Sequence, residues 1–299
     1  MASTSTATPT QYLTLPTSRH HPLLLYGTAW KTTSTTPLVT SALQAGFKGI
    51  DTACQPKHYR EDLVSPAIPP SLRDQLFIQT KFTPPSGQDP QNSPYDFELP
   101  VEEQVKTSVA TSLRNLGTSY LDAVLLHSPL PTVAETVKAW KVLQEFVEAG
   151  TIRHLGISNV SLKQLTALYS HPEVTTKPSI IQNRFYPATK WDRDVRRFCK
   201  ERGMVWQSFW TLTGNPGLLR SEVVGRVAGG VLGDEMARRE EALYLLVLAL
   251  GRGWEGGGVC VLDGTTRVEG MRGDLEAVGK LAEVEERDVL EFRGLIEDL

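Results

Sequence analysis

The stretch VEEQVKTSVATSLRNLGTSYLDAVLLHS, residues 101–128, decides the fold. In its first half an apolar residue returns every three or four positions, forming one stripe along a helix: Val101, Val105, Val109, Leu113 and Leu116. Gly117 follows, and glycine commonly ends a helix. Residues 120–128 are a nearly continuous apolar run, as expected of a parallel strand covered on both faces. The stretch therefore predicts a helix followed by a buried parallel strand.

This unit recurs along the chain. Eight short apolar segments are separated by helical patterns, at 23–27, 47–53, 76–82, 120–128, 154–159, 180–185, 204–209 and 259–264. Further helices are predicted over 132–150 and, behind a capping box of Ser161 and Gln164, over 162–170. Eight such units close into a (β/α)8 TIM barrel, whereas an open doubly wound sheet more often uses fewer strands and a glycine-rich first turn. No G-x-G-x-x-G motif follows these segments, so we predict a single α/β barrel domain over residues 1–299.

Five segments fall outside the alternation. YLTLP, residues 12–16, is predicted as a short extra strand before the barrel, and the helical pattern up to Leu299 predicts a C-terminal helix. Residues 1–11 are expected to be disordered. The stretch 83–100 contains five prolines and is expected to be a long loop on the substrate side. Residues 251–258, GRGWEGGG, are expected to be a flexible insertion before the last strand.

The charge and the cysteine content limit the kinds of binding partner and the cellular compartment that we expect. Lys and Arg total 31 against 34 for Asp and Glu, so no broad field favours nucleic acid or an anionic membrane. Three cysteines without paired spacing, Cys54, Cys199 and Cys260, indicate neither a disulfide framework nor a zinc site. The first 18 residues match no signal or transit peptide, and the longest apolar run, 242–250, is too short to cross a membrane. We expect a cytoplasmic monomer or small homo-oligomer that acts on a small molecule without a metal.

Polar side chains follow the predicted strands at their carboxyl ends, where TIM barrels carry their active sites. Asp51, Lys81 and His127 end the second, third and fourth strands, and Tyr59 follows Asp51 in a loop. Such a set can protonate a developing alkoxide. Lys81 would lower the pKa of Tyr59 from about 10 toward neutrality. Asp51 would hold Lys81, and His127 would donate a hydrogen bond to a substrate carbonyl.

Several motifs in order carry a resemblance: GTAW at 27–30, GIDTA at 49–53, Lys81 in IQTKF, His127 in LLHS, GISN at 156–159, Gln182 in IIQNRF, Ser208, and GTTRVEGMRGDL at 264–275. Together they resemble the aldo-keto reductases, a barrel family that reduces aldehydes and ketones with NADPH, and the resemblance covers most of residues 23–278.

The resemblance implies a role for each matching residue. Asp51, Tyr59, Lys81 and His127 would form the catalytic tetrad, with Tyr59 as the general acid. Trp30 would face the substrate. The cofactor would be held by Gly27, Thr28, Ser158, Asn159, Gln182, Ser208, Gly264, Thr265, Thr266 and Arg272, with Ser158, Asn159 and Gln182 on the nicotinamide carboxamide and the 264–274 loop at the adenosine end.

The chain departs from the family pattern at both ends of the expected cofactor. The tyrosine comes eight residues after Asp51 instead of five, with Pro56 in the usual place. Gly270 replaces the arginine that usually binds the 2′-phosphate, a loss of about 1.5 to 3 kcal/mol. The other departures are Gly264-Thr265 for Lys-Ser, Asp274 for Asn, and Gln207 for the ring that stacks on the nicotinamide; Arg267, Arg272, Phe209 or Trp210 could compensate. NADH is therefore an alternative to NADPH.

Two other functions stay open at this point. The altered adenosine end suits a non-catalytic reductase-like barrel that binds cofactor weakly or serves as a scaffold. A lysine at a barrel strand end can also be a nucleophile, so Lys81 suits a Schiff-base lyase as well. In the reductase interpretation, substrate selectivity falls to Trp30 and the 83–100 loop.

Overall fold

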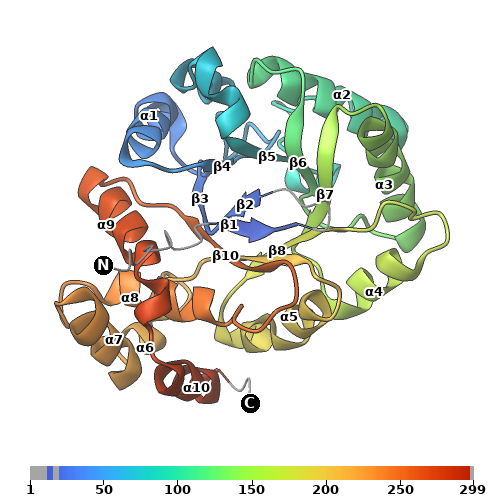
Figure 1. Cartoon of the computed structure of the whole chain (residues 1–299). Helices are drawn as coiled ribbons and strands as arrows, with labels where there is room; N and C mark the ends of the chain where they lie inside the picture. The colour runs from blue at the N-terminus through green and yellow to red at the C-terminus, as the bar shows by residue number, and fades with distance from the viewer. Residues whose placement is uncertain (1–11, 16–19, 297–299) are drawn as a thin grey trace, which may run out of the picture.

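Eight parallel strands close into a barrel in the computed structural model of the chain, which describes residues 12–15 and 20–296 (Figure 1). The neighbours around the barrel run β10-β3-β4-β5-β6-β7-β8-β9. Their bounds are β3 Leu24–Gly27, β4 Gly49–Asp51, β5 Phe77–Phe82, β6 Leu121–Leu126, β7 Ile152–Ser158, β8 Ile180–Arg184, β9 Val205–Phe209 and β10 Gly258–Asp263. Each predicted apolar segment contains or overlaps one of these strands, so the predicted barrel is confirmed.

Helices form a ring outside the strands (Figure 1). They are α1 Thr35–Ala45, α2 Val101–Asn115, α3 Val133–Glu148, α4 Leu162–Ser170, α5 Arg193–Lys200, α6 Pro216–Leu219, α7 Glu222–Leu232, α8 Arg239–Ala249, α9 Val268–Gly279 and α10 Glu286–Leu295. The predicted C-terminal helix is α10. Three helices, α6 to α8, stand between β9 and β10, where simple alternation predicts one. None of the helices in the described residues is both long and apolar enough to span a membrane.

The second β/α unit differs from the predicted alternation. Residues 52–76, all of which the structure describes, contain three short 3₁₀ helices instead of an α-helix: η2 Glu61–Leu63, η3 Ser65–Ala67 and η4 Pro70–Gln75. Pro66, Pro69 and Pro70 explain the difference, because proline lacks the amide hydrogen that an α-helix interior needs and its ring clashes with the preceding turn.

A short hairpin packs against the barrel through Leu15, the residue that follows its first strand. Strand β1, Tyr12–Thr14, pairs antiparallel with β2, His20–Pro22. The predicted N-terminal strand is therefore confirmed over 12–14, whereas β2 was not predicted. Leu15 joins the apolar cluster inside the barrel. Pro16 and residues 1–11 lie outside the described residues.

The 83–100 loop packs on the loop that connects Asp51 and Tyr59. It contains one 3₁₀ helix, η5 Pro85–Gly87, and Gln55 Nε2 donates to Gly87 O at 2.6 Å. Gln88 Nε2 donates to Cys54 O at 2.8 Å. The two loops therefore support each other. In the other expected irregular segment, residues 251–256 form turns and bends, Gly257 forms an isolated bridge with Thr14, and Gly258 already belongs to β10.

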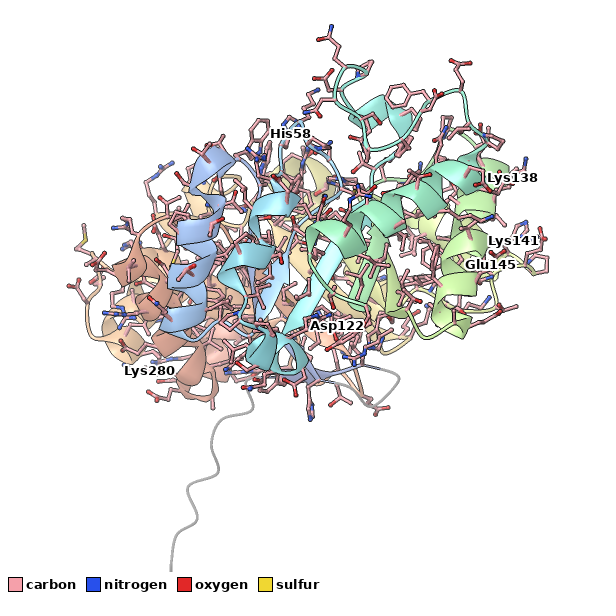
Figure 2. All side chains as sticks on the ribbon, turned by 90° about the horizontal axis from the view of Figure 1, so that it is seen from above. His58, Asp122, Lys138, Lys141, Glu145 and Lys280 are labelled. Carbon is pink, nitrogen blue, oxygen red and sulfur yellow. The ribbon has the colours of Figure 1, made fainter. Side chains whose placement is uncertain are left out.

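The apolar core has two parts, one inside the barrel and one between the strands and the helices. Its inner cluster consists of Leu15, Leu25, Phe77, Ala123, Leu125, Ile180, Val205 and Cys260, and a larger cluster lies between strands and helices. Figure 2 shows His58 at one end of the barrel and Asp122 toward the other. His58 follows the carboxyl end of β4, so its end of the barrel is the one predicted to carry the chemistry.

The capping box before α3 allows a test of local stability. Thr132 Oγ1 accepts from Glu135 N at 3.1 Å, and Glu135 Oε2 accepts from Thr132 N at 3.0 Å. We expect Thr132→Ala to lower the free energy of unfolding by about 1 kcal/mol in urea titrations, because an N-terminal amide loses its acceptor. Thr40→Ala is the control, since among the described residues Thr40 Oγ1 donates only to Thr36 O, within α1. Equal losses in both variants would contradict the capping role.

Candidate active site

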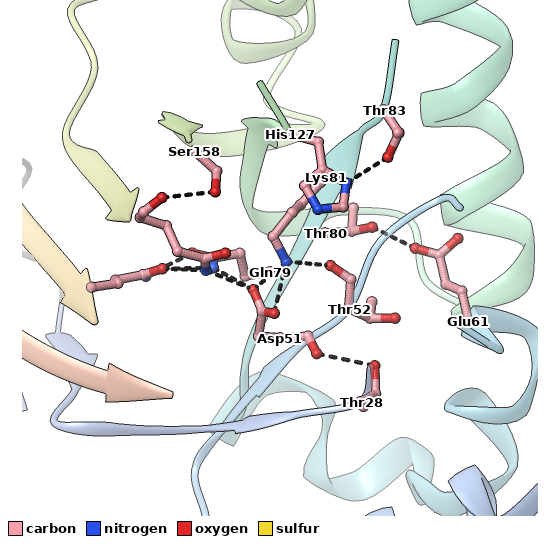
Figure 3. A network of polar contacts seen from close by, with 12 residues as sticks. Thr28, Asp51, Thr52, Glu61, Gln79, Thr80, Lys81, Thr83, His127 and Ser158 are labelled. Atoms are coloured by element: carbon pink, nitrogen blue, oxygen red, sulfur yellow. Dashed lines mark hydrogen bonds and ion pairs between the residues drawn. The ribbon is translucent and has the colours of Figure 1, made fainter. Parts of the chain in front are cut away.

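Asp51 and Lys81 form a buried ion pair at the carboxyl end of the barrel (Figure 3). Their exposed fractions are only 2% and 1%. Lys81 Nζ lies 2.6 Å from Asp51 Oδ1, 2.7 Å from Asp51 Oδ2 and 2.8 Å from Thr52 O. Each of the three ammonium hydrogens therefore has an acceptor. Burial lowers the pKa of Lys81, and the charge of Asp51 opposes that shift.

The hydrogen bonds of Lys81 argue against a Schiff-base lyase. A nucleophilic lysine needs a neutral amine whose lone pair faces the substrate. Here Nζ points into the barrel toward a carboxylate and a carbonyl, which are acceptors and require a donor. The lyase interpretation of Lys81 is therefore not supported by the geometry.

Three glutamines form a buried layer beneath this pair. Gln79 Nε2 and Gln182 Nε2 donate to Asp51 Oδ1 at 2.7 and 3.0 Å. Gln207 accepts from both amides, at 2.9 and 2.8 Å, and Gln207 Nε2 lies 2.9 Å from His21 Nε2. The residues come into reach because Asp51 pairs in register with Gln79, and Gln182 with Gln207. The side chain of Asp51 thus accepts hydrogen bonds from two amides as well as from Lys81.

Gln79 was missed as a site residue. It lies two positions before Lys81 on β5, so both side chains point into the barrel. That spacing was the available signal, but an uncharged amide in a strand interior did not stand out in the sequence.

Tyr59 lies above the ion pair in spite of its lengthened loop. Its ring centroid is 5.4 Å from Lys81 Nζ and 5.9 Å from the His127 ring. Within the described part of the chain, no hydrogen bond involves the Tyr59 hydroxyl. A cavity of about 400 Å³ between the two supporting loops is lined by Tyr59, Asn92 and Ser93, among others. The half-buried ring of Tyr59, which carries this hydroxyl, therefore borders the cavity.

The predicted direction of the Tyr59 pKa shift is wrong. Burial, followed by the charge of Asp51, raises the pKa of Tyr59 above its usual value. Lys81 does not lower it, because the ammonium is paired with Asp51. Tyr59 is therefore a protonated phenol, the form that a general acid needs before reaction.

His127 is neutral and held in one orientation. Its Nδ1 lies 2.6 Å from Thr83 Oγ1, and Asn159 Nδ2 donates to its backbone oxygen at 2.9 Å. Burial, with the charges of Lys81 and His58, lowers the pKa of His127 well below its usual range. When Thr83 donates to Nδ1, Nε2 carries the hydrogen and can donate to a carbonyl oxygen. Thr83 was not predicted as a site residue, although it lies two positions after Lys81, the same spacing that separates Gln79 from Lys81.

Trp30 lies at the rim beside the same loop. Its ring lies against the His58 ring at a tilt of 37°, with centroids 3.8 Å apart, and its amide donates to His58 O at 2.7 Å. Its exposed fraction is 70%. His58, which follows no strand directly, therefore positions the tryptophan that was predicted to face the substrate.

The sequence matches the model of the Aldo/keto reductase family over residues 25–235, about two thirds of the chain's length and all but the last of its barrel strands. The chain belongs to the aldo/keto reductase family. Solved members share its fold: a Brucella melitensis aldo/keto reductase has a TM-score of 0.73 at 21% identity, covering 95% of this chain and 98% of that one. An aldo-keto reductase from a deep-sea metagenome has a TM-score of 0.75 at 19% identity, covering 96% of each chain.

Relatives of this aldo/keto reductase chain include named oxidoreductases. An uncharacterized oxidoreductase of Schizosaccharomyces pombe is 30% identical over 59% of this chain and 58% of its own length. An aldehyde reductase of Saccharomyces cerevisiae is 26% identical over 71% of this chain and 72% of its own. A methylglyoxal reductase of Yersinia pestis is 28% identical over 64% and 62%. The first and third of these matches thus span less than two thirds of the relative's own length.

The residues predicted for the nicotinamide gather at the carboxyl ends of β7 and β8. Ser158 Oγ donates to Gln182 O at 2.7 Å, and Asn159 Nδ2 lies 3.2 Å from Ser158 Oγ. Both hydrogens of the Gln182 amide are used on Asp51 and Gln207. Among the described residues no donor reaches Gln182 Oε1, so this oxygen can accept from a carboxamide. These residues fit a nicotinamide. Thr28 lies nearby, with its hydroxyl and amide donating to Asp51 O at 3.0 Å each.

The loop predicted for the adenosine end lies beside the first barrel strand. Asp263 pairs in register with Tyr26, next to Gly27, and Tyr26 OH donates to Thr265 O at 3.0 Å. Lys31 Nζ donates to Gly264 O. Thr266 and Arg272 are exposed, and Ser208 Oγ contacts Thr211 Oγ1 inside the rim.

Two buried carboxyl groups, Asp263 and Asp274, lie at this end of the predicted cofactor site. Burial, followed by the charge of Asp263, raises the pKa of Asp274 to about 9. The Asp263 carboxyl is buried and shares a hydrogen bond with the protonated Asp274 carboxyl, so the pair carries a single negative charge. A ribose hydroxyl can donate to this charged pair, whereas the oxygens of a phosphate dianion can only accept. The residues therefore fit a ribose better than a 2′-phosphate.

Proposed function

We propose that this protein reduces the carbonyl group of a small aldehyde or ketone with a nicotinamide cofactor. The convergence of Asp51, Lys81, Tyr59 and His127 at one barrel end carries the proposal. The reductase names among the relatives support it. When bound, the reduced nicotinamide supplies the hydride from its C4 to the carbonyl carbon.

The side chains would handle the oxygen of that carbonyl. His127 Nε2–H donates to the oxygen and orients it, since Nδ1 is engaged by Thr83. Tyr59 transfers its proton to the alkoxide as negative charge develops there. The phenolate left behind faces the Lys81 ammonium, which lies 5.4 Å from the ring and is held by Asp51. Asp51 and Lys81 thus act through Tyr59.

The activity is tested with a panel of aldehydes and ketones, with absorbance of the reduced cofactor as the readout. Turnover that depends on Tyr59 supports the proposal. The alternative, a non-catalytic barrel, is favoured only by the altered adenosine end. It predicts cofactor binding without turnover of any carbonyl.

The cofactor preference depends on Asp263 and its neighbours. The family resemblance implies NADPH, but a 2′-phosphate would add negative charge beside the single charge that Asp263 and Asp274 share, and Gly270 offers no cation. We expect fluorescence titration to give NADH a Kd no weaker than that of NADPH. Asp263→Asn is expected to strengthen NADPH binding about threefold or more relative to NADH, because one carboxylate charge is removed. Asp74→Asn, an exposed change in η4, is the control, and an unchanged ratio in Asp263→Asn would contradict this account.

The remaining expectations concern location and assembly. Cys54, Cys199 and Cys260 are free and buried, which supports the proposed cytoplasmic location. Fractionation of cells that express the tagged chain would test the location, and light scattering would distinguish a monomer from a small homo-oligomer.

A further inference from the structure

A cationic groove lies beside the tetrad, between the ends of β7 and β8. Its volume is about 380 Å³. It is lined by Asn159, Ser161, Arg184, Tyr186, Thr189 and Lys190, among others. Asn159 also holds the backbone oxygen of His127 at 2.9 Å, so the groove begins one side chain away from the tetrad. The proposed reaction assigns no role to this groove.

Arg184 projects toward the mouth of the barrel. It lies two positions after Gln182 on β8, so both side chains point to the same face of the strand. Gln182 reaches Asp51 inside the barrel. With a rise of about 3.3 Å per residue, Arg184 stands roughly 7 Å farther along the strand, above the tetrad.

Aromatic rings hold the Arg184 guanidinium in place. Its carbon atom Cζ lies 4.5 Å from the centroid of Trp210 and 5.7 Å from that of Phe209. Trp210 is 50% exposed and packs edge-on against Tyr186. Both rings that the sequence offered for stacking on the nicotinamide, Phe209 and Trp210, thus lie near Arg184. A guanidinium stacked on rings keeps its N–H donors in its plane and can still bind an anion.

The carboxylates of the groove already have donors. Asp192 is buried, and its Oδ2 accepts from Trp206 Nε1 at 2.7 Å and Asn183 Nδ2 at 2.9 Å. Asp194 contacts Arg193 at 3.3 Å. In the part of the chain that the structure describes, neither Arg184 nor Lys190 forms an ion pair. The groove therefore offers cationic donors to a ligand.

We propose that this groove binds the carboxylate of an anionic carbonyl substrate, with Arg184 as its principal contact. The proposal rests on the proposed reductase function and adds its substrate class: an aldehyde or ketone that carries a carboxylate several bonds from the carbonyl. An arginine binds a carboxylate through two parallel N–H donors, a geometry that a neutral ester cannot match. A phosphate of the cofactor is the other anion that could occupy the groove.

The test combines binding and turnover. Calorimetry would measure the affinity for 4-(hydroxymethyl)benzoate and for its methyl ester, which need no turnover. Steady-state kinetics would compare 4-carboxybenzaldehyde with methyl 4-formylbenzoate. Arg184→Gln is expected to weaken binding of the acid and to lower kcat/KM for the acid aldehyde about tenfold or more, while both ester values change less than about twofold. Arg287→Gln on α10, an exposed loss of the same charge, should change none of them.

The possible outcomes separate the hypotheses. Equal affinities of wild type for acid and ester, or equal losses in Arg184→Gln, would overturn the substrate site. A weaker Kd for both NADH and NADPH in Arg184→Gln, with acid and ester affected alike, would assign the groove to a cofactor phosphate instead. Selective binding of the acid without reduction of either aldehyde would support the site and refute the reductase function.

Discussion

Replacement of Tyr59 by phenylalanine is expected to lower kcat for carbonyl reduction by about two to four orders of magnitude. The substitution removes only the hydroxyl that would protonate the alkoxide, and the ring can keep its contacts with Lys81 and His127. Affinity for the nicotinamide cofactor should not change, since no predicted cofactor contact is removed. Steady-state rates at saturating cofactor, together with fluorescence titration, measure both quantities.

Tyr169→Phe is the matched control. Tyr169 lies on α4 and packs edge-on against Phe198, away from the tetrad, and within the described residues its hydroxyl makes no hydrogen bond. Full activity is expected in this variant. A Tyr59→Phe enzyme that keeps more than a tenth of the wild-type rate would remove Tyr59 from the role of general acid.

The raised pKa of Tyr59 also predicts the pH dependence of reduction. The acid works when protonated, so activity is lost only as pH rises through its pKa. Burial and Asp51 place that pKa above the ordinary value of about 10. We therefore expect kcat for reduction to stay level between about pH 7 and 10. A decline centred near neutral pH would show instead that Lys81 lowers the pKa of Tyr59.

Lys81→Met is expected to lower the free energy of unfolding by about 3 to 5 kcal/mol, in addition to abolishing activity. The change leaves the Asp51 carboxylate buried without a cation, which is the costly way to break a buried ion pair. Gln79 and Gln182 would remain as donors, but amides do not neutralise the charge. Urea titrations followed by circular dichroism measure the loss.

Two variants control for this effect. Lys106→Met breaks the exposed pair with Glu103, in which both side chains are about half exposed, and should cost at most about 1 kcal/mol. Asp51→Asn combined with Lys81→Met removes both charges and should recover part of the stability. If Lys81→Met and Lys106→Met have equal effects, burial of the ion pair is not the cause.

Much of the barrel could be predicted because parallel strands covered on both faces are apolar throughout. The capping box of Ser161 and Gln164 predicted α4, and the apolar stripe that ends at Gly117 predicted α2. The alternation of strands and helices predicted an α-helix in the second unit. That prediction was wrong, because Pro66, Pro69 and Pro70 interrupt the segment after Tyr59 and periodicity alone takes no account of them.

The sequence by itself determined which polar residues stand at strand ends, and so the identities of Asp51, Lys81 and His127 as site candidates. Only the tertiary structure decided what surrounds them. Gln182 reaches Asp51 across 131 positions, and the pKa of Tyr59 rises because folding buries it beside a carboxylate whose lysine partner is already paired. Protonation depends on burial and on charges brought from distant strands, and neither is a property of local sequence.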